Sequence, residues 1–483
     1  MGKTPHPTPY TLPLGKTFSA DPTYTYMSNL SLGAQPPLEF IPPDLNSLLL
    51  KGCQIFLPLW LQTQTNLREI SAANLETLIT FYQKSQEKKV RLLLAFRHPS
   101  INDPYCMAYL LWKLVPKKAE ELGIKLNKPI HAHFMYDRGI PLWAGERVGW
   151  LYSKLGGTPI QRGKADLIGL RSARRLLLEG DYPLAAAPEG ATNGHNELVS
   201  AIEPGISQLA FWGVDDVKKA KQQQEVIILP IGIQYFYLTP VWQEIEQILT
   251  NLENDSGLET TPNSSLKEKV LYERLFRLGE RLLSLMEDFY RDFYYQSLPV
   301  VPANGDDPNE TLAKRLANLL DVALQTVEKY FNVSPNGNVI DRCRRLEQAG
   351  WERIYRQELK PTHSISPLEL GLADRLADEA NLKMWHMRIV ESFVSVTGYY
   401  VKEKPTVERF AETILLLWDL VTRIKGGNPF FRPQIGQQKA IITIGKPISV
   451  SERYADYKSD RRSAVAQLTQ DLQTSLESLI IHQ

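Results

Sequence analysis

The feature that most constrains the fold is an uninterrupted apolar run at residues 90–96, which carries a single charged residue, Arg91. A charged cluster precedes this run, and Pro99 follows it closely. A continuous apolar segment of this length, bounded in this way, is typical of a strand that is buried in a parallel sheet. We therefore expect a sheet of this kind at the centre of the molecule.

Further strands and helices alternate with this run along residues 89–240. Asp103 and Pro104 provide an N-cap acid and a proline at the first position of a helix. Strands are expected at 130–135, 158–161, 182–187 and 223–233, and helices at 105–114, 147–155 and 173–179. Such alternation is typical of an α/β layered fold with a mostly parallel sheet.

The N-terminal part of the chain has a different pattern. Residues 1–36 are rich in proline and lack periodicity, which predicts an extended or disordered arm. Residues 37–88 predict a helical segment with one helix at 45–57, ended by Pro58, and a second at 72–85.

The character of the sequence changes again after residue 240. Residues 241–435 predict almost only helices, whose apolar stripes we interpret as packing within a helical subdomain rather than a cofactor site. A strand-like run at 439–444 and an amphipathic helix at 463–481 then predict a return to the first domain across 436–483. The expected architecture is one α/β domain interrupted by an all-helical insertion.

Composition excludes several classes of protein. The net charge of +1, from 55 basic and 54 acidic residues, gives no reason to expect nucleic-acid binding. Cys53, Cys106 and Cys343 are isolated, which suits a reducing compartment and indicates neither a metal centre nor disulfides. No segment has the roughly 20 uninterrupted apolar residues of a membrane span. We expect a cytoplasmic protein that is soluble or lies peripherally on a membrane.

A histidine and an acid behind the first strand are candidates for chemistry. His98 and Asp103 would lie about 140° apart around a helix axis, so they can meet only if the segment is a strand end, a turn and a helix N-terminus. Asp103 could then accept the Nδ1–H of His98 and leave Nε2 free as a base. The alternative is a loop histidine beside a capping acid, and these two residues alone leave both interpretations open.

Three later segments place polar residues at expected strand ends. Arg162 follows the expected strand at 158–161, and Glu189 with Gly190 follows the one at 182–187. Pro230 interrupts the apolar strand at 223–233. Ligands of α/β sheets bind at the carboxyl ends of strands, so these residues are expected to converge with His98.

In this order, the four segments resemble the four sequence blocks of the glycerolipid acyltransferases, in particular the 1-acylglycerol-3-phosphate acyltransferases. The matched positions are His98, Ser100 and Asp103 in the first block, Gly156, Ile160 and Arg162 in the second, Pro188, Glu189 and Gly190 in the third, and Pro230 in the fourth. Residues 444–448 resemble a late Ile-Gly-x-Pro-Ile strand of the family. The resemblance covers about 89–240 and 436–483, and the helical block at 241–435 matches nothing in it.

The resemblance implies an enzyme of phospholipid biosynthesis. It would move a fatty acyl group from a thioester of coenzyme A or acyl carrier protein to the hydroxyl of a glycerol phosphate-type acceptor such as 1-acylglycerol-3-phosphate. His98 would be the general base and Asp103 its orienting carboxylate, and no cofactor is implied beyond the thioester co-substrate. Lipid substrates also imply peripheral contact with a membrane.

The same resemblance assigns the acceptor site. Arg162 would bind the phosphate, Glu189 and Gly190 would shape the pocket, and Thr192 would donate a hydroxyl. Thr192 stands where the family carries an arginine, so one cation is missing. Two alternatives follow: an acyltransferase for another, unphosphorylated lipid alcohol, or a non-catalytic lipid-binding protein with a relict site.

Three other polar residues could supply a charge or a ligand. Arg97 replaces the asparagine of the family. It either restores a positive charge near the site or lies at a strand end in solvent, and we expect the second. His131 and His133 alternate on an expected strand, which would put both rings on one face. With no third ligand nearby in the sequence, we expect strand-face residues and no metal site.

Overall fold

The computed structural model describes residues 33–161, 166–260, 268–301, 307–360, 364–393, 399–429 and 431–482, without the side chains of residues 142 and 143. The predicted arm at 1–36 therefore lies almost entirely outside the described residues. Its last residues include Gln35, which forms an isolated bridge with Tyr355.

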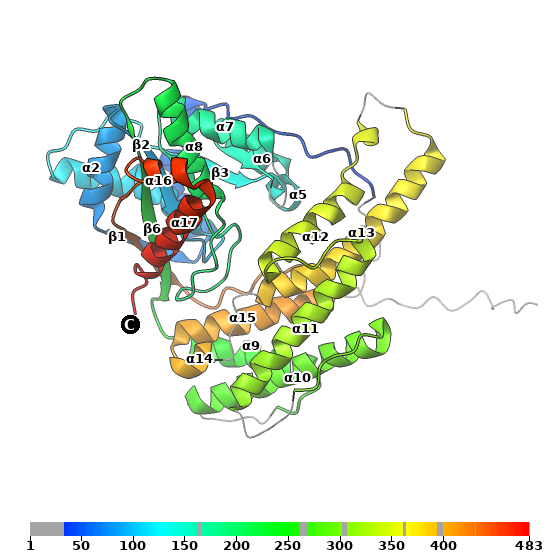
Figure 1. Ribbon diagram of the computed structural model, residues 1–483. Helices are drawn as coiled ribbons and strands as arrows, with labels where there is room; N and C mark the ends of the chain where they lie inside the picture. Colours follow the sequence, from blue (N-terminus) through cyan, green and yellow to red (C-terminus); the bar gives the residue numbers. More distant parts are fainter. Residues whose placement is uncertain are drawn as a thin grey trace, which may run out of the picture.

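An eight-stranded sheet forms the centre of the α/β part, in the order β1-β7-β6-β2-β5-β3-β4, with β8 paired to β6 (Figure 1). The strands are β1 (Leu67–Ala73), β2 (Val90–Phe96), β3 (His133–Asp137), β4 (Thr158–Ile160), β5 (Leu184–Ala186), β6 (Glu225–Tyr237), β7 (Gln438–Ile444) and β8 (Ile448–Ser449). Strands β6, β2, β5, β3 and β4 run parallel, whereas β7 and β8 are antiparallel to β6. The mixed α/β class with a mostly parallel sheet is thus confirmed.

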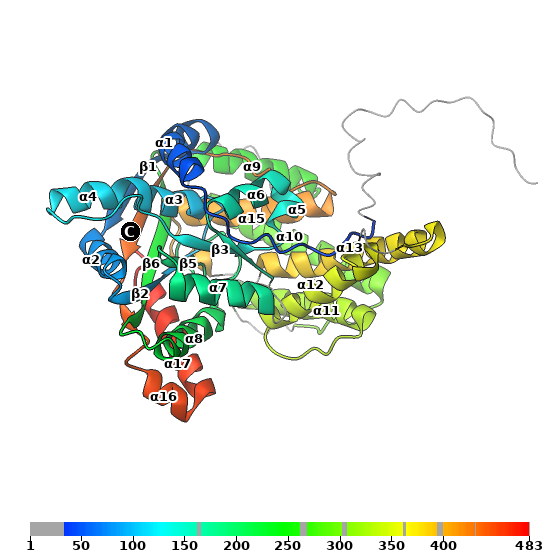
Figure 2. The ribbon, with the colours of Figure 1, turned by 90° about the horizontal axis from the view of Figure 1, so that it is seen from above.

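Helices cover both faces of this sheet, and Figure 2 shows them on its two sides. One side carries α1 (Ser47–Gln64), α2 (Leu75–Gln86), α3 (Asp103–Tyr109), the π-helix η1 (Leu110–Leu114) and α4 (Val115–Glu121). The other carries α7 (Leu167–Glu179), α8 (Gly205–Lys219), α16 (Tyr454–Ser459) and α17 (Arg461–Glu477). Leu92 and Leu94 of β2 pack into the first layer, and Leu93 and Ala95 into the second. The apolar run is continuous because both of its faces are buried.

Two expectations for residues 37–88 are wrong. The segment is not purely helical, because it contains β1, a strand at the edge of the sheet whose residues are mostly exposed or half-buried. Its apolar residues form neither a regular alternation nor a continuous run, so the pattern does not identify a strand. The first helix also continues through Pro58, since Leu57 and Leu61 are buried on either side of it. Their burial outweighs the cost of a proline inside a helix, about 3 kcal/mol.

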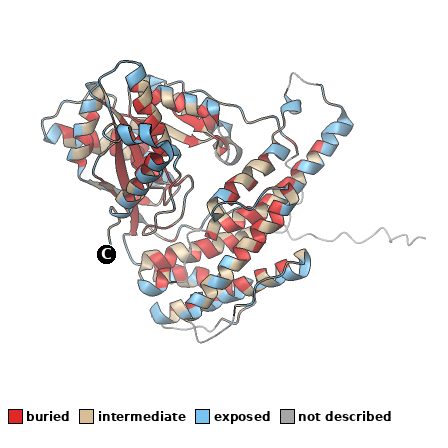
Figure 3. Cartoon of the chain, in the orientation of Figure 1, coloured by how far each residue is buried: buried red, intermediate tan, exposed pale blue. Residues whose placement is uncertain are grey.

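Between β6 and β7, the described elements are helices (Figure 1). They are α9 (Trp242–Asp255), α10 (Glu268–Tyr294), α11 (Pro308–Phe331), α12 (Val339–Ile354), the 3-10 helix η2 (Gln357–Leu359), α13 (Pro367–Phe393), α14 (Tyr400–Glu403) and α15 (Val407–Ile424). They share an apolar core of their own, and Figure 3 shows their buried residues on the faces they turn to one another. The short helices α5 (Ile140–Ala144) and α6 (Glu146–Lys154) connect β3 to β4.

The chain leaves and re-enters the sheet at neighbouring positions. The backbone N–H of Leu238 donates to the carbonyl of Gln437 at 2.9 Å, and β7 then pairs along β6. None of the helices in the described part of the chain combines the length and apolarity needed to cross a bilayer.

Candidate active site

His98 and Asp103 form a hydrogen-bonded pair at the carboxyl end of β2. His98 follows the strand, and Asp103 opens α3 after a tight turn. The His98 Nδ1 lies 2.8 Å from the Asp103 Oδ2, which also accepts the backbone N–H of Ser100 at 2.8 Å. Because a carboxylate can only accept a hydrogen bond, the neutral imidazole carries its proton on Nδ1 and keeps a free lone pair on Nε2.

Tyr235 of β6 holds the far side of the carboxylate. Its hydroxyl donates to the Asp103 Oδ1 at 2.5 Å and lies 3.4 Å from the Sγ of Cys106. Burial, together with the negative charge of Asp103, raises the pKa of Tyr235 well above its ordinary value. The phenol therefore stays protonated and acts as a fixed donor. The sequence gives no signal for this residue, because it lies in an apolar strand 132 residues from Asp103.

Glu189 is a buried residue of the loop that follows β5, and both of its carboxylate oxygens accept hydrogen bonds from the protein. Its Oε1 accepts the backbone N–H of His98 at 2.7 Å. Its Oε2 accepts the Asn193 side chain at 2.8 Å and the Ser200 backbone N–H at 3.0 Å. Burial raises the pKa of Glu189, an effect that Arg97 and the two backbone N–H groups oppose. Glu189 thus fixes the backbone at His98 and the loop around it.

Gly190 provides the turn that follows Glu189. Its φ of +72° lies in the left-handed region, and a Cβ there would stand 2.3 Å from the Glu203 Oε1. Both facts favour glycine at this position.

Arg97 is buried, so its expected place in solvent is wrong. Its guanidinium donates to the carbonyl oxygens of Asn196 at 2.5 Å, Leu198 at 2.6 Å and His195 at 3.1 Å. Its Nε also lies 3.9 Å from the Glu189 Oε1. The loop after β5 folds over the end of β2 and encloses the arginine, which local sequence does not reveal. Arg97 therefore joins that loop to the end of β2.

Thr192 is exposed, and its Oγ1 lies 3.1 Å from the His98 Nε2. Since Nε2 carries a lone pair, the threonine hydroxyl is the donor in this contact. The contact shows that a hydroxyl can reach the free nitrogen from the solvent side. His98 itself is accessible there, with 23% of its side chain exposed.

The structure thus brings together four of the predicted residues, namely His98, Asp103, Glu189 and Thr192, with Gly190 beside them. Pro230 pairs in register with Ala95 of β2, two residues before Arg97. Arg162 lies outside the described residues, so its expected contact with phosphate remains a prediction.

The two alternating histidines are structural. His131 precedes β3, which begins at His133, so the two do not share one strand as expected. His131 Nε2 lies 2.8 Å from the Leu155 carbonyl oxygen, and His133 Nδ1 lies 2.9 Å from that of Gly156. Burial lowers the pKa of both, that of His131 to about 4. No group of side chains able to hold a metal ion occurs among the described residues.

The arrangement is suited to removing a proton from a hydroxyl group. In its neutral form the imidazole presents Nε2 to an accessible surface. A buried carboxylate, itself held by the Ser100 N–H and the Tyr235 hydroxyl, accepts from its other nitrogen. Comparison with models of protein families, with curated proteins and with solved structures finds no match for this chain.

Proposed function

We propose that this protein transfers a fatty acyl group from a thioester of coenzyme A or acyl carrier protein to the hydroxyl of a lipid acceptor. The observation that carries the proposal is the His98–Asp103 pair, whose free Nε2 already contacts a hydroxyl, that of Thr192. The resemblance of four ordered sequence blocks to the glycerolipid acyltransferases supports the same reaction. The acceptor that this resemblance favours is of the glycerol phosphate type, such as 1-acylglycerol-3-phosphate.

In the proposed reaction, the acceptor hydroxyl replaces the hydroxyl of Thr192 at the His98 Nε2. As its oxygen attacks the thioester carbonyl, its proton passes to Nε2. The tetrahedral intermediate then collapses, the C–S bond breaks, and the imidazolium returns the proton to the leaving thiolate. Asp103 stabilises the imidazolium in between, and Tyr235 and the Ser100 N–H hold the carboxylate in place.

An exposed apolar surface beside the site supports contact with a membrane. Helix α1 exposes the large side chains of Leu48, Ile55, Phe56, Leu59 and Trp60. The ring of Trp60 lies 6.4 Å from that of Tyr105, in the helix that Asp103 opens. Exposed apolar patches of this kind mark interaction sites. We propose that α1 rests on the bilayer and brings the site to its lipid acceptor.

One observation favours a second candidate, acyl transfer to an unphosphorylated lipid alcohol. Thr192 occupies the position of the family's arginine, and Arg97 cannot replace that cation because three carbonyl groups hold it inside the protein. Comparing 1-acylglycerol-3-phosphate with monoacylglycerol as acceptors separates the two candidates. A clear preference for the phosphorylated acceptor, lost in Arg162→Ala, would remove the second.

The central test compares purified wild type with His98→Ala by measuring thiol release from palmitoyl-coenzyme A. Loss of the general base is expected to lower kcat by about 10²–10⁴-fold while the protein remains folded. His482→Ala, at an exposed histidine, is the matched control and should keep the wild-type rate. Wild-type turnover by His98→Ala would refute the mechanism. A wild type that releases no thiol from either palmitoyl-coenzyme A or palmitoyl-acyl carrier protein would favour a non-catalytic lipid-binding protein.

A further inference from the structure

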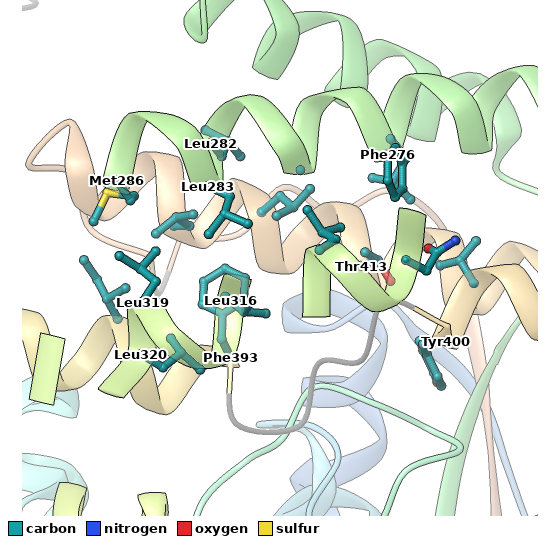
Figure 4. Close-up of a pocket in the computed structure, with 18 of the residues that line it drawn as sticks. Phe276, Leu282, Leu283, Met286, Leu316, Leu319, Leu320, Phe393, Tyr400 and Thr413 are labelled. Atoms are coloured by element: carbon teal, nitrogen blue, oxygen red, sulfur yellow. The ribbon is translucent and has the colours of Figure 1, made fainter. Parts of the chain in front are cut away.

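A narrow apolar cavity runs through the helical region between β6 and β7. Its volume is about 130 Å³, and α10, α11, α13, α14 and α15 contribute its lining. Along α10 the lining extends from Tyr272 to Met286, a length of about 21 Å at 1.5 Å per residue. In Figure 4, Met286 lies at one end, Leu316 in the middle and Tyr400 at the other end. A small volume spread over this length fits a slender, unbranched molecule.

A glycine keeps the middle of this cavity open. Gly279 lies inside α10 and lines the cavity, and the nearest atom to a Cβ placed there would be the Leu312 Cδ2 at 4.0 Å. Glycine inside a helix costs about 1 kcal/mol relative to alanine, so the helix itself does not favour it. Space that a side chain could fill is instead left empty between α10 and α11.

Polar groups gather at one end of the cavity. Tyr272 donates its hydroxyl to the Asn309 Oδ1 at 2.7 Å, and both residues line the cavity. The rings of His195 and Tyr400, also in the lining, lie 5.0 Å apart. The opposite end, around Met286, is apolar. A cavity with one polar and one apolar end matches a ligand with a polar head and an alkyl tail.

The polar end is connected to the candidate active site through a single loop. His195 lies three residues after Thr192, and its carbonyl accepts from the Arg97 guanidinium at 3.1 Å. The backbone N–H of Asn193, two residues before His195, donates to the carbonyl of His98 at 3.2 Å. Burial lowers the pKa of His195 to about 4, so this end presents a neutral imidazole rather than a cation.

We infer that this cavity binds one unbranched alkyl chain of a lipid substrate, with the methyl end near Met286 and the head near His195 and Tyr400. That the chain belongs to a substrate rests on the proposed function, whereas binding of an alkyl chain does not. The chain can come from the acyl thioester or from the lipid acceptor, since both carry one. Apolar cavities of comparable volume stay dry and bind apolar ligands.

The test is binding of cis-parinaric acid, a fluorescent fatty acid, to the full-length protein and to Gly279→Leu. A Cβ at this position meets no backbone atom within 4 Å, and the rest of the leucine side chain would extend into the cavity. Each buried methylene contributes about fourfold in affinity, so excluding two or more should raise Kd at least tenfold. Gly371→Leu is the matched control, because Gly371 also lies inside a helix, α13, and a Cβ there meets nothing within 4 Å. It should bind like wild type.

Two results would overturn the inference: no saturable binding by wild type, or equal affinity of folded Gly279→Leu and wild type. If Gly279→Leu does not fold, Leu316→Phe narrows the same cavity from α11 and carries the same expectation. Binding is measured without turnover, so an inactive wild type would refute the proposed function and leave this result standing.

Chain-length series then identify the source of the alkyl chain. Donor thioesters from decanoyl to stearoyl are compared at fixed acceptor, and acceptors of the same lengths at fixed donor. We expect Gly279→Leu to lower kcat/KM selectively for long chains in one of the two series. The substrate varied in that series is the one whose alkyl chain lies in the cavity. An unchanged length dependence in both series would overturn the assignment to a substrate chain.

Discussion

Replacing Arg97 with methionine tests whether a buried cation holds the loop after β5 against the end of β2. The guanidinium donates hydrogen bonds to three backbone carbonyl groups and lies beside the carboxylate of Glu189. Hydrogen bonds to charged groups contribute about 1.5–3 kcal/mol each, and removing one partner of a buried ion pair costs about 3–5 kcal/mol. These interactions overlap, so we expect Arg97→Met to lower the free energy of unfolding by about 3–5 kcal/mol.

The loss of stability should appear both in unfolding of the whole protein and in local opening of the loop after β5. Thermal unfolding followed by circular dichroism should give a Tm lower by about 3–5 °C for a chain of this length. Hydrogen exchange of the amides at 193–200 should accelerate more than that of the strand amides, because the arginine is their connection to β2. Acyl transfer should fall as well, since the loop carries Thr192 and anchors Glu189.

Two variants calibrate this result. Arg97→Lys keeps a charge near Glu189, but a compact ammonium cannot reach all three carbonyl groups, so about half of the loss should remain. Arg68→Met removes another arginine that donates to two backbone carbonyls, those of Thr65 and Leu67, far along the chain from this loop. Arg68 is exposed, and we expect its replacement to lower the free energy of unfolding by less than about 1 kcal/mol. Equal stability of Arg97→Met and Arg68→Met would refute the reasoning.

Two further variants test the buried groups around the site. Tyr235→Phe removes the hydroxyl donor of the buried Asp103 Oδ1. The free energy of unfolding should therefore fall by about 1.5–3 kcal/mol, and kcat should fall by less than it does in His98→Ala. Unchanged values of both quantities would contradict this role of Tyr235. The second residue is Glu412 of α15, which accepts a hydrogen bond from the Asn196 side chain at 2.7 Å. Burial, with smaller contributions from Glu197 and Glu408, raises the pKa of Glu412 from 4.5 to about 8. Its contribution to stability is therefore complete below about pH 4.5 and is lost, at about 1.4 kcal/mol per pH unit, as the pH rises toward 8. Urea unfolding across this range should show that the free energy of unfolding falls less steeply with pH in Glu412→Gln than in the wild type. Equal dependence on pH in the two proteins would refute the raised pKa of Glu412.

The sequence was sufficient where the determining contacts are local. His98 and Asp103 lie five residues apart, and the strand, turn and proline between them restrict how they can meet. The apolar run of β2 likewise indicates burial on both faces, because helices cover both faces of a central parallel strand. The type of strand could therefore be predicted from a single segment, whereas assigning the histidine–aspartate pair to a site also needed the three later segments.

The sequence was insufficient where burial depends on distant segments. Tyr235 reaches Asp103 only because β6 and β2 are neighbours, and Arg97 is enclosed only because the loop after β5 folds over it. β1 was missed because it pairs with β7, near the other end of the chain. None of these contacts leaves a periodic or compositional signal in the residues that make them.

The pairing of β1 with β7 has a consequence for how the protein is synthesised. Among the described strands, β7 is the partner of β1 and also covers one side of β6. Residues that meet at this junction, Asn66 and Gly436, are 370 positions apart. At 5–20 residues per second, a ribosome needs roughly 20 to 75 s to span that interval. Until then β1 has no partner and β6 presents an open apolar edge, so the nascent chain should depend on a chaperone.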